Sequence, residues 1–306
     1  MILITGGAGF IGSHCVWELL AEGAKIRVLD DFSSGKRDNL PASPNLDVIE
    51  GDVRDAACVD RCMCDVTHVL HLAAQVSVPQ SIREPVNSHS INIAGFLNVL
   101  DAVRRHGAQR MVYASSAAVY GVPDELPLSE QSGAQPLSPY GLEKLVNEQY
   151  ANLYGALYRV STLGLRYFNV YGARQDPRSP YSGVISKFAD WAIAGQPFLV
   201  HGDGKQTRDF IHAGDVARAN VAALKSTTCG VINIGTGRSV TLLELIEAFE
   251  GALGGAVEVR HLDAREGEVP YSSVTPRRMR EELGIASTTP LDEGIALLMK
   301  YLQARR

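Results

Sequence analysis

The sequence lacks the features that mark membrane, nucleic-acid-binding and repetitive proteins. No apolar stretch approaches the roughly 20 residues that a membrane-spanning helix needs. There are 29 Lys and Arg against 34 Asp and Glu, and a net charge of −5 argues against a nucleic-acid surface. Internal repeats, low-complexity tracts and charged tails are also absent. We expect a globular protein without membrane or nucleic-acid partners and, because the chain starts directly on an apolar segment, a cytoplasmic one.

Cysteine is scarce, with five residues in 306. Three of them, Cys58, Cys62 and Cys64, cluster near His68 and His71, so a metal site has to be weighed. Their spacing is C-x3-C-x-C, which differs from the paired C-x-x-C of zinc sites. We therefore predict reduced cysteines packed on a helix and a loop and no metal ion; a zinc assay on the purified protein distinguishes the two.

The chain opens with the pattern of a dinucleotide-binding unit. The apolar, β-branched run at residues 1–5 predicts a buried strand, and the segment Gly7-Ala8-Gly9-Phe10-Ile11-Gly12 fits G-x-G-x-x-G. Helical apolar spacing follows at residues 13–22, and then a second strand at 25–29. Glycines at these positions let the backbone approach a pyrophosphate, whose charge faces the N-terminus of the helix.

The acidic residues after the second strand indicate which dinucleotide binds. Asp30 follows Gly12 by 18 residues (30 − 12), close to the spacing of about 20 expected for the carboxylate that accepts ribose hydroxyls. Asp31 beside it would repel a 2′-phosphate, although Lys36 and Arg37 moderate that preference. We predict NAD as the cofactor rather than NADP.

A tyrosine and a lysine, Tyr140 and Lys144, stand four residues apart later in the chain. On a helix this spacing puts both side chains on one face. An ammonium beside a phenol stabilises the phenolate, so we expect the tyrosine pKa to be lowered. A phenolate can remove a proton from a sugar or alcohol hydroxyl. The pair gains its meaning from the dinucleotide-binding opening, because chance alone often produces this spacing.

Strand and helix patterns alternate through the first half of the chain, and this alternation predicts an α/β fold with a doubly wound parallel (Rossmann) sheet over residues 1–170. The expected strands lie at residues 46–50, 66–72, 110–114 and 162–168, and the expected helices at 91–106 and 140–154. Loops lengthen afterwards. Residues 171–306 are expected to form a smaller α/β domain that binds the substrate, with some segments returning to the first. Its expected elements are a helix at 184–194 and strands at 232–234 and 257–260.

With these residues in hand, the chain resembles the extended short-chain dehydrogenase/reductase family and, within it, the nucleotide-sugar 4-epimerases. The similarity runs nearly from end to end. The matching segments are residues 5–14, 71–74, 115–121, 140–144, 166–169, 206–210 and 265–268. Residues 174–177 and 181–188 look like the UDP-N-acetylglucosamine 4-epimerase group.

The resemblance implies a catalytic set of three residues. Tyr140 would take the proton from the C4 hydroxyl of the sugar while the C4 hydride passes to NAD. Lys144 would lower the tyrosine pKa and bind the nicotinamide ribose. Ser116 would hydrogen-bond the C4 oxygen, although a serine at the end of a strand can simply cap its own turn. Ser115 is the lesser candidate for this role.

The resemblance also implies how the cofactor is held. Asp52 and Val53 would contact the adenine, and small residues after the fourth strand would line the ribose and phosphate wall. Asn92 would lie near Lys144, or else serve as a polar residue in the first turn of a helix. The expected cofactor-binding set is Gly6, Gly9, Phe10, Ile11, Gly12, Asp30, Asp31, Asp52, Val53, Leu72, Ala73, Ala74, Asn92, Tyr140 and Lys144.

The substrate implied by the resemblance is a UDP-sugar. Asn169, Arg208 and Arg265 would hold the UDP part, since guanidinium groups bind phosphate oxygens in forked pairs. The arginines could instead form surface ion pairs with their acidic neighbours, Asp209 and Glu266. Asp203 and Glu268 would bind uridine or ribose, or order a loop.

Two alanines argue against some of the reactions that related enzymes catalyse. Related 4,6-dehydratases carry an Asp-Glu pair after the serine or threonine of the fifth strand, and this chain has Ala117 and Ala118 there. Methyl groups cannot protonate a leaving hydroxyl, and the carboxylate that decarboxylating relatives need is missing from the same region. What remains is oxidation at C4, rotation of the 4-keto sugar and reduction from the other face, with NAD bound throughout.

The choice of sugar depends on Ser272, which aligns with a position where related epimerases carry either a tyrosine or a small residue. A small side chain leaves room for an N-acetyl group. We therefore expect interconversion of UDP-GlcNAc and UDP-GalNAc. The alternatives are a UDP-glucose/UDP-galactose or a UDP-glucuronate 4-epimerase, and, from another class, a non-catalytic NAD sensor, which would typically lack the tyrosine or the lysine. The family also implies a homodimer through helices near residues 93–106 and 140–154.

Overall fold

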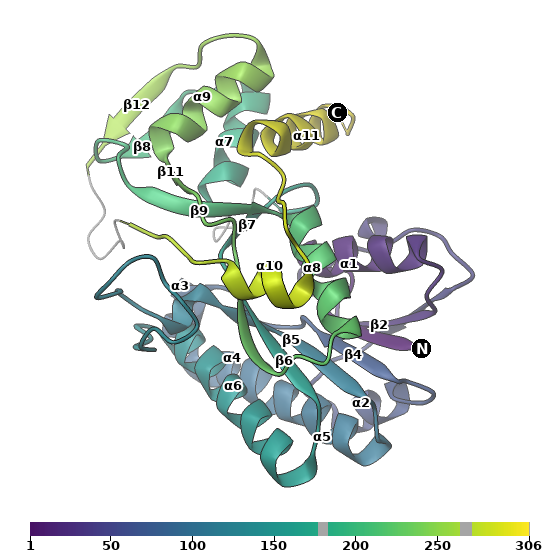
Figure 1. The fold of residues 1–306 in the computed structure, drawn as a ribbon. Coiled ribbons are helices and arrows are strands. Elements are labelled where there is room, and N and C mark those ends of the chain that lie inside the picture. Colours follow the sequence, from purple (N-terminus) through teal and green to yellow (C-terminus); the bar gives the residue numbers. More distant parts are fainter. Residues whose placement is uncertain (177–182, 264–270, 306) are drawn as a thin grey trace.

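The computed structural model describes residues 1–176, 183–263 and 271–305. A seven-stranded parallel sheet forms its centre, in the order β10-β6-β5-β4-β1-β2-β3 (Figure 1). The strands are β1 (Ile2–Thr5), β2 (Ile26–Asp30), β3 (Leu46–Glu50), β4 (His68–His71), β5 (Arg110–Ser116), β6 (Thr162–Tyr167) and β10 (Gly230–Ile234). The predicted doubly wound parallel sheet is thereby confirmed.

Helices cover both faces of this sheet, which explains why its central strands are apolar and β-branched with little alternation. One face packs against α1 (Phe10–Ala21), α8 (Ala213–Lys225) and α10 (Arg277–Leu283). The other packs against α2 (Ala56–Cys62), α5 (Phe96–His106) and α6 (Pro139–Tyr158). In β6 every residue is buried.

Capping residues in the sequence account for both ends of helix α6. Ser138 is the N-cap, and its side chain accepts a hydrogen bond from the Gly141 backbone N–H at 3.1 Å. Pro139 follows at the first helical position, where a missing N–H costs nothing. The helix ends at Arg159, which adopts a left-handed conformation with φ of 59°. These ends fix the helix that carries Tyr140 and Lys144.

A second layer of structure stands at the carboxyl ends of the central strands, at the top of Figure 1. It contains a three-stranded sheet in the order β11-β9-β7 and the pair β12-β8. Aromatic packing among Phe188, Phe198 and Phe249 fills its core. Its elements are β7 (Asn169–Tyr171), α7 (Val184–Ala194), β8 (Phe198–His201), β9 (Thr207–His212), β11 (Ser239–Thr241), α9 (Leu242–Leu253), β12 (Val259–Leu262) and α11 (Leu291–Gln303).

Several expected elements differ in detail from the structure, among them the strand expected at 257–260, which is β12 at Val259–Leu262. The strand expected at 232–234 is β10, which pairs with β6 in the central sheet. The single helix expected at 91–106 begins with a π-helical turn, Ser90–Gly95, before α5. The remaining short elements are α3 (Val78–Arg83), α4 (Pro85–His89) and two 3-10 turns at Arg37–Asn39 and Ala117–Val119. Within the described ranges, no helix is both long and apolar enough to span a bilayer.

Candidate active site

A cavity of about 1210 Å³ lies between the central sheet and the second layer. Its walls come from the carboxyl ends of β1, β2, β4, β5 and β6, and from α7 and β9. The strand order reverses between β1 and β4, and open parallel sheets bind their ligands at such a reversal. The fold therefore places this cavity where a dinucleotide and a second ligand can meet.

The glycine-rich turn forms the floor of one half of this cavity. Gly6, Gly9, Phe10, Ile11 and Gly12 all line it, and α1 begins at Phe10. Gly6 has φ of 70°, and a Cβ there would lie 2.7 Å from the Ala73 backbone nitrogen. A Cβ on Gly12 would lie 2.1 Å from the Gly6 carbonyl oxygen. The turn is therefore closed to larger residues, and it fits a phosphate group at the start of α1.

Asp30 lies at the end of β2 and is 6% exposed. Its carboxylate accepts hydrogen bonds from the backbone N–H groups of Ala8 at 2.8 Å and Phe32 at 2.9 Å. A carboxylate has about four acceptor sites, so capacity remains for ribose hydroxyls. Burial raises its pKa, although these backbone bonds oppose the rise.

The two basic side chains that could bind a 2′-phosphate, Lys36 and Arg37, already form ion pairs with carboxylates. Lys36 Nζ lies 2.9 Å from Asp176 Oδ2, and Arg37 Nη2 lies 2.8 Å from Glu50 Oε2. Asp31 also lines the cavity, where it accepts hydrogen bonds from Ser33. This arrangement fits NAD better than NADP, as the acidic sequence predicts.

The far wall of this half follows β3 and β4. Asp52 lines the cavity, and its carboxylate is held by Arg54 through contacts of 2.8 and 2.5 Å, which lower its pKa. Other expected wall residues that line the cavity are Val53, Leu72, Ala73 and Ala74. All the expected cofactor-binding residues except Asn92 therefore meet around one space.

The expected catalytic side chains come together at the centre of the cavity. Ser116 ends β5, and its side chain lies close enough to the Tyr140 hydroxyl to lower the pKa of that tyrosine against burial. It also caps its own turn, by accepting a bond from the Ala118 N–H at 3.1 Å. Lys144 Nζ donates to the Ala114 carbonyl oxygen at 3.0 Å and lies 5.7 Å from the centre of the Tyr140 ring. Ser115 instead donates to Glu148.

The expected lowering of the Tyr140 pKa by Lys144 is wrong for this structure. Burial raises the pKa of Tyr140, and the hydrogen bond from Ser116 is what opposes the rise. Burial also lowers the pKa of Lys144 to about 8, against the attraction of Glu143 and Glu148. The spacing of the two residues predicts that they pair, but it carries no signal of how deeply both are buried.

Asn92, which was expected either near Lys144 or as a polar residue in a helix turn, is not among the residues that line the cavity. It lies in the π-helical turn, is 1% exposed, and donates to the Glu143 carboxylate at 2.6 Å and to the Gln75 carbonyl at 2.9 Å. The Asn92 amide therefore joins the π-helical turn to α6 through Glu143.

The substrate half of the cavity contains Asn169 and Arg208. The Asn169 side chain donates to the Asp209 carbonyl, while the Asp209 carboxylate accepts hydrogen bonds from Thr236 and Gly237. Ser272 is not among the described lining residues, but its N–H donates to the Thr207 carbonyl next to Arg208. Arg265 and Glu268 lie outside the described residues.

Helix α7 supplies a wall whose residues were given no binding role by the sequence motifs. Val184, Lys187, Phe188 and Trp191 all line the cavity. Their spacing of three and four residues marks one face of the helix, so the helical period was the available signal. Arg174 also lines the cavity, with φ of 68° and its guanidinium 5.9 Å from the Trp17 ring.

None of the clustered cysteines is among the residues that line this cavity. Cys58 and Cys62 are buried on α2, whereas Cys64 is exposed. His71 is buried and its Nδ1 is 2.8 Å from Thr5 Oγ1. In the part of the chain that the structure describes, no three His, Cys, Asp or Glu side chains are grouped to hold a metal ion.

Comparison with known proteins identifies the family. The model of the NAD dependent epimerase/dehydratase family matches residues 2–235. A UDP-glucose 4-epimerase of Mycolicibacterium smegmatis is 37% identical over 98% of this chain and 98% of its own length.

Two solved structures are similar along the whole chain. One is a UDP-N-acetylglucosamine 4-epimerase of Methanobrevibacter ruminantium in complex with UDP-N-acetylmuramic acid, which is 35% identical, with a TM-score of 0.94 over 100% of this chain and 98% of that one. The other is a UDP-glucose 4-epimerase of Thermus thermophilus in complex with NAD, 38% identical, with a TM-score of 0.91 over 100% and 99%. The chain therefore belongs to the NAD dependent epimerase/dehydratase family, as its motifs predict.

Proposed function

We propose that this protein is a UDP-sugar 4-epimerase that interconverts UDP-GlcNAc and UDP-GalNAc through a transient 4-keto sugar. The meeting of Ser116, Tyr140 and Lys144 in one cavity carries the proposal. The residues after Ser116 are Ala117 and Ala118, which offer no acid to drive dehydration. Reversible oxidation at a single carbon is the chemistry that this set supports.

Each of the three side chains has a distinct task in this mechanism. Tyr140, as its phenolate, accepts the proton of the C4 hydroxyl and later returns it. The Ser116 side chain acts on the pKa of Tyr140, so its hydroxyl is near enough to bridge the phenol and the C4 oxygen. Lys144, as its ammonium, would bind the nicotinamide ribose. Bound NAD supplies the hydride acceptor at C4 and the donor for the return step.

The preference for an acetylated sugar rests on Ser272. Its backbone N–H donates to Thr207 at 3.1 Å and its carbonyl accepts from Ser239 at 2.9 Å, so the residue is tied to β9 beside Arg208. A serine at this place would leave more room than a tyrosine, which would project a ring from the same backbone position. We propose that this space receives the N-acetyl group.

The Ser272→Tyr variant tests the sugar preference. We expect turnover of UDP-GlcNAc to fall at least tenfold, with turnover of UDP-glucose retained, because added volume is rejected in a close-packed site. Ser272→Ala is the matched control and should keep both activities. Product formation from each sugar can be followed by NMR. Equal rates on both sugars in Ser272→Tyr would overturn the assignment.

UDP-glucuronate remains the second candidate because cations line the cavity. A glucuronate carboxylate needs a positive partner, and Arg174 and Lys187 are both among the lining residues. Incubation with UDP-GlcNAc, UDP-glucose, UDP-galactose and UDP-glucuronate, with Tyr140→Phe as the inactive control, ranks the candidates. A non-catalytic sensor would show no turnover in either protein.

We also propose a homodimer that pairs α5 and α6 with their copies. Leu153 and Leu157 are 48% and 62% exposed and stand one turn apart on α6. Tyr158 is half exposed nearby, with Arg104 of α5 over its ring at 5.1 Å. An apolar strip of this kind favours a partner. Light scattering that gives the mass of one 33.0 kDa chain would exclude the dimer.

A further inference from the structure

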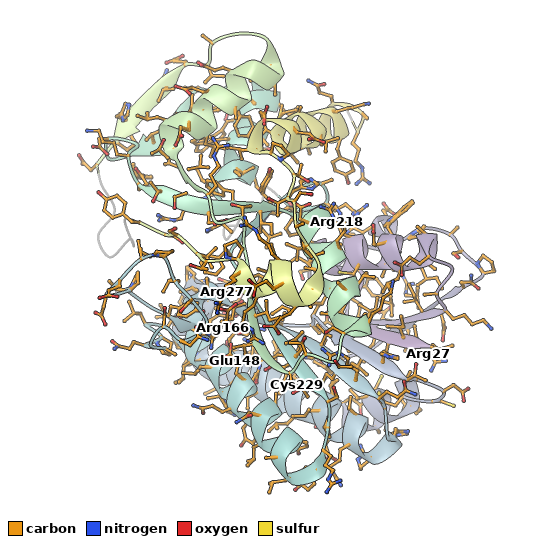
Figure 2. All side chains as sticks on the ribbon, viewed as in Figure 1. Arg27, Glu148, Arg166, Arg218, Cys229 and Arg277 are labelled. Atoms are coloured by element: carbon orange, nitrogen blue, oxygen red, sulfur yellow. The ribbon has the colours of Figure 1, made fainter. Side chains whose placement is uncertain are left out.

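A buried ion pair lies directly behind the proposed catalytic residues. Glu148 is 8% exposed and Arg166 is 6% exposed. Arg166 Nε lies 2.9 Å from Glu148 Oε1, and its Nη2 lies 2.7 Å from Oε2, so the guanidinium grips both carboxylate oxygens. Figure 2 labels the two residues beside each other, between α6 and the central sheet.

This pair ties the catalytic helix to the catalytic strand. Tyr140, Lys144 and Glu148 follow one another at intervals of four residues, which places them on one face of α6. Ser115 donates to Glu148 Oε1 at 2.5 Å, and Ser115 is in register with Arg166 across β5 and β6. One carboxylate therefore joins a helix and the ends of two strands.

Three successive residues of β5 thus bind three residues of α6. The Ala114 carbonyl accepts from Lys144, the Ser115 hydroxyl donates to Glu148, and the Ser116 side chain lies beside the Tyr140 hydroxyl, whose pKa it lowers. The middle contact lies between the two that carry the proposed chemistry. A shift of β5 along α6 would break all three together.

Arg166 is itself fixed from the other side. Its Nη1 donates to the Tyr120 hydroxyl at 2.8 Å, and its guanidinium carbon lies 4.8 Å from the centre of the Tyr120 ring. Tyr120 in turn donates to Asn233 on β10 at 2.6 Å. Buried ion pairs contribute little net stability compared with apolar packing, so stability alone does not explain so elaborate a network.

We propose that Glu148, held by Arg166, is a positioning residue that sets Tyr140 and Lys144 against Ser116 and provides a counter-charge for the Lys144 ammonium. This inference rests on the catalytic roles proposed above. The charged and titratable groups that face Lys144 are Tyr140, Glu143 and Glu148 from its own helix and His71 from β4. His71 is buried with a pKa lowered to about 3, so it is neutral at working pH.

The charges around Lys144 determine the direction in which the pH dependence of activity should shift. Lys144 has a pKa of about 8, so its ammonium is present below that pH and is lost above it. Glu148 raises the pKa of Lys144 against burial. Removing the Glu148 charge lowers the pKa of Lys144 further, and activity that needs the ammonium should then decline at a lower pH.

The test compares Glu148→Gln and Ser115→Ala with the native enzyme over a range of pH. We expect kcat to fall about tenfold or more in both variants, with KM changed less than about threefold, because a displaced catalytic group costs rate more than binding. The alkaline limb should move to lower pH in Glu148→Gln alone, because Ser115→Ala removes a contact but no charge. Glu148→Asp, which keeps the charge, should restore the native position of the limb. The milder Ser115→Ala keeps the proposal testable if Glu148→Gln does not fold.

A matched ion pair controls for stability. Arg278 and Glu282 on α10 make a similar two-point contact of 2.5 and 2.8 Å, and neither lines the cavity. Glu282→Gln should leave kcat and the pH profile unchanged. Variants of Glu148 and Ser115 that lose activity only in proportion to their unfolded fraction, with a native pH profile, would overturn the positioning role. Full activity in Tyr140→Phe would instead overturn the proposed function itself.

Discussion

The two halves of the cavity are built in different ways. The dinucleotide half uses short segments that follow β1, β2, β3 and β4, so most of its residues lie within the first 74 positions. The nucleotide-sugar half combines Asn169, a face of α7 and Arg208, which are spread over about forty residues and belong to three separate elements. The dinucleotide half is therefore formed by segments close together in the sequence, whereas the nucleotide-sugar half is formed by side chains from separate elements.

This difference predicts how amino-acid substitutions in each half affect the binding of cofactor and substrate. The glycine turn is backbone packed against backbone, with no freedom to adjust around an added atom. Side chains on separate elements form the substrate half, so losing one should weaken binding without displacing the others. Damage to the first half should therefore remove the cofactor, and damage to the second should mainly raise KM.

The largest effect, a loss of bound NAD, is expected from Gly12→Ala. Its new Cβ would lie 2.1 Å from the Gly6 carbonyl oxygen and 2.8 Å from the Gly7 Cα, so the backbone must move. We expect the NAD content of the purified protein, measured by absorbance after denaturation, to fall at least tenfold.

Gly251→Ala is the matched control for that variant. Gly251 lies in α9, and nothing stands within 4 Å of the place that an added methyl group would take. The change should therefore stabilise the helix by up to about 1 kcal/mol and leave NAD content alone. Native NAD content in Gly12→Ala would show that the turn tolerates more than its backbone contacts indicate, and would break the comparison.

A smaller and more selective effect is expected from Arg208→Gln. A hydrogen bond to a charged group contributes about 1.5–3 kcal/mol, so the KM for the UDP-sugar should rise roughly 10- to 100-fold. NAD content should stay native because Arg208 belongs to β9 in the other half. Arg260→Gln, an exposed arginine paired with Glu258, is the control. Loss of NAD in Arg208→Gln would mean that the two halves are not independent.

The smallest effect is expected from Lys36→Met, which removes an ion pair between the halves. Lys36 and Asp176 are 53% and 38% exposed, and pairs this exposed contribute no more than about 1 kcal/mol. The rate of NAD dissociation should therefore rise less than about fivefold, and Lys36→Arg should restore it. A much larger change would sharpen the comparison by showing that this contact closes the dinucleotide half.

The same distinction explains which expectations succeeded. The strands at residues 46–50 and 162–168 and the helix at 184–194 were predicted within one residue of their observed ends, because hydrophobic period is a local signal. The lining role of Lys187 was missed, although its helical spacing was visible. The hydrogen bonds of Asn92 could not be predicted, because its partner, Glu143, lies 51 residues away.

The sequence by itself determined the parallel sheet built on the first six strands, the glycine turn, the acidic selection of NAD and the pairing of Tyr140 with Lys144. Each of these depends on residues within one or two elements. Only the tertiary structure decided the direction in which the pKa values of that pair shift and the contact of Ser115 with Glu148. Burial and long-range hydrogen bonds set both, and they arise when β5, β6 and α6 pack together.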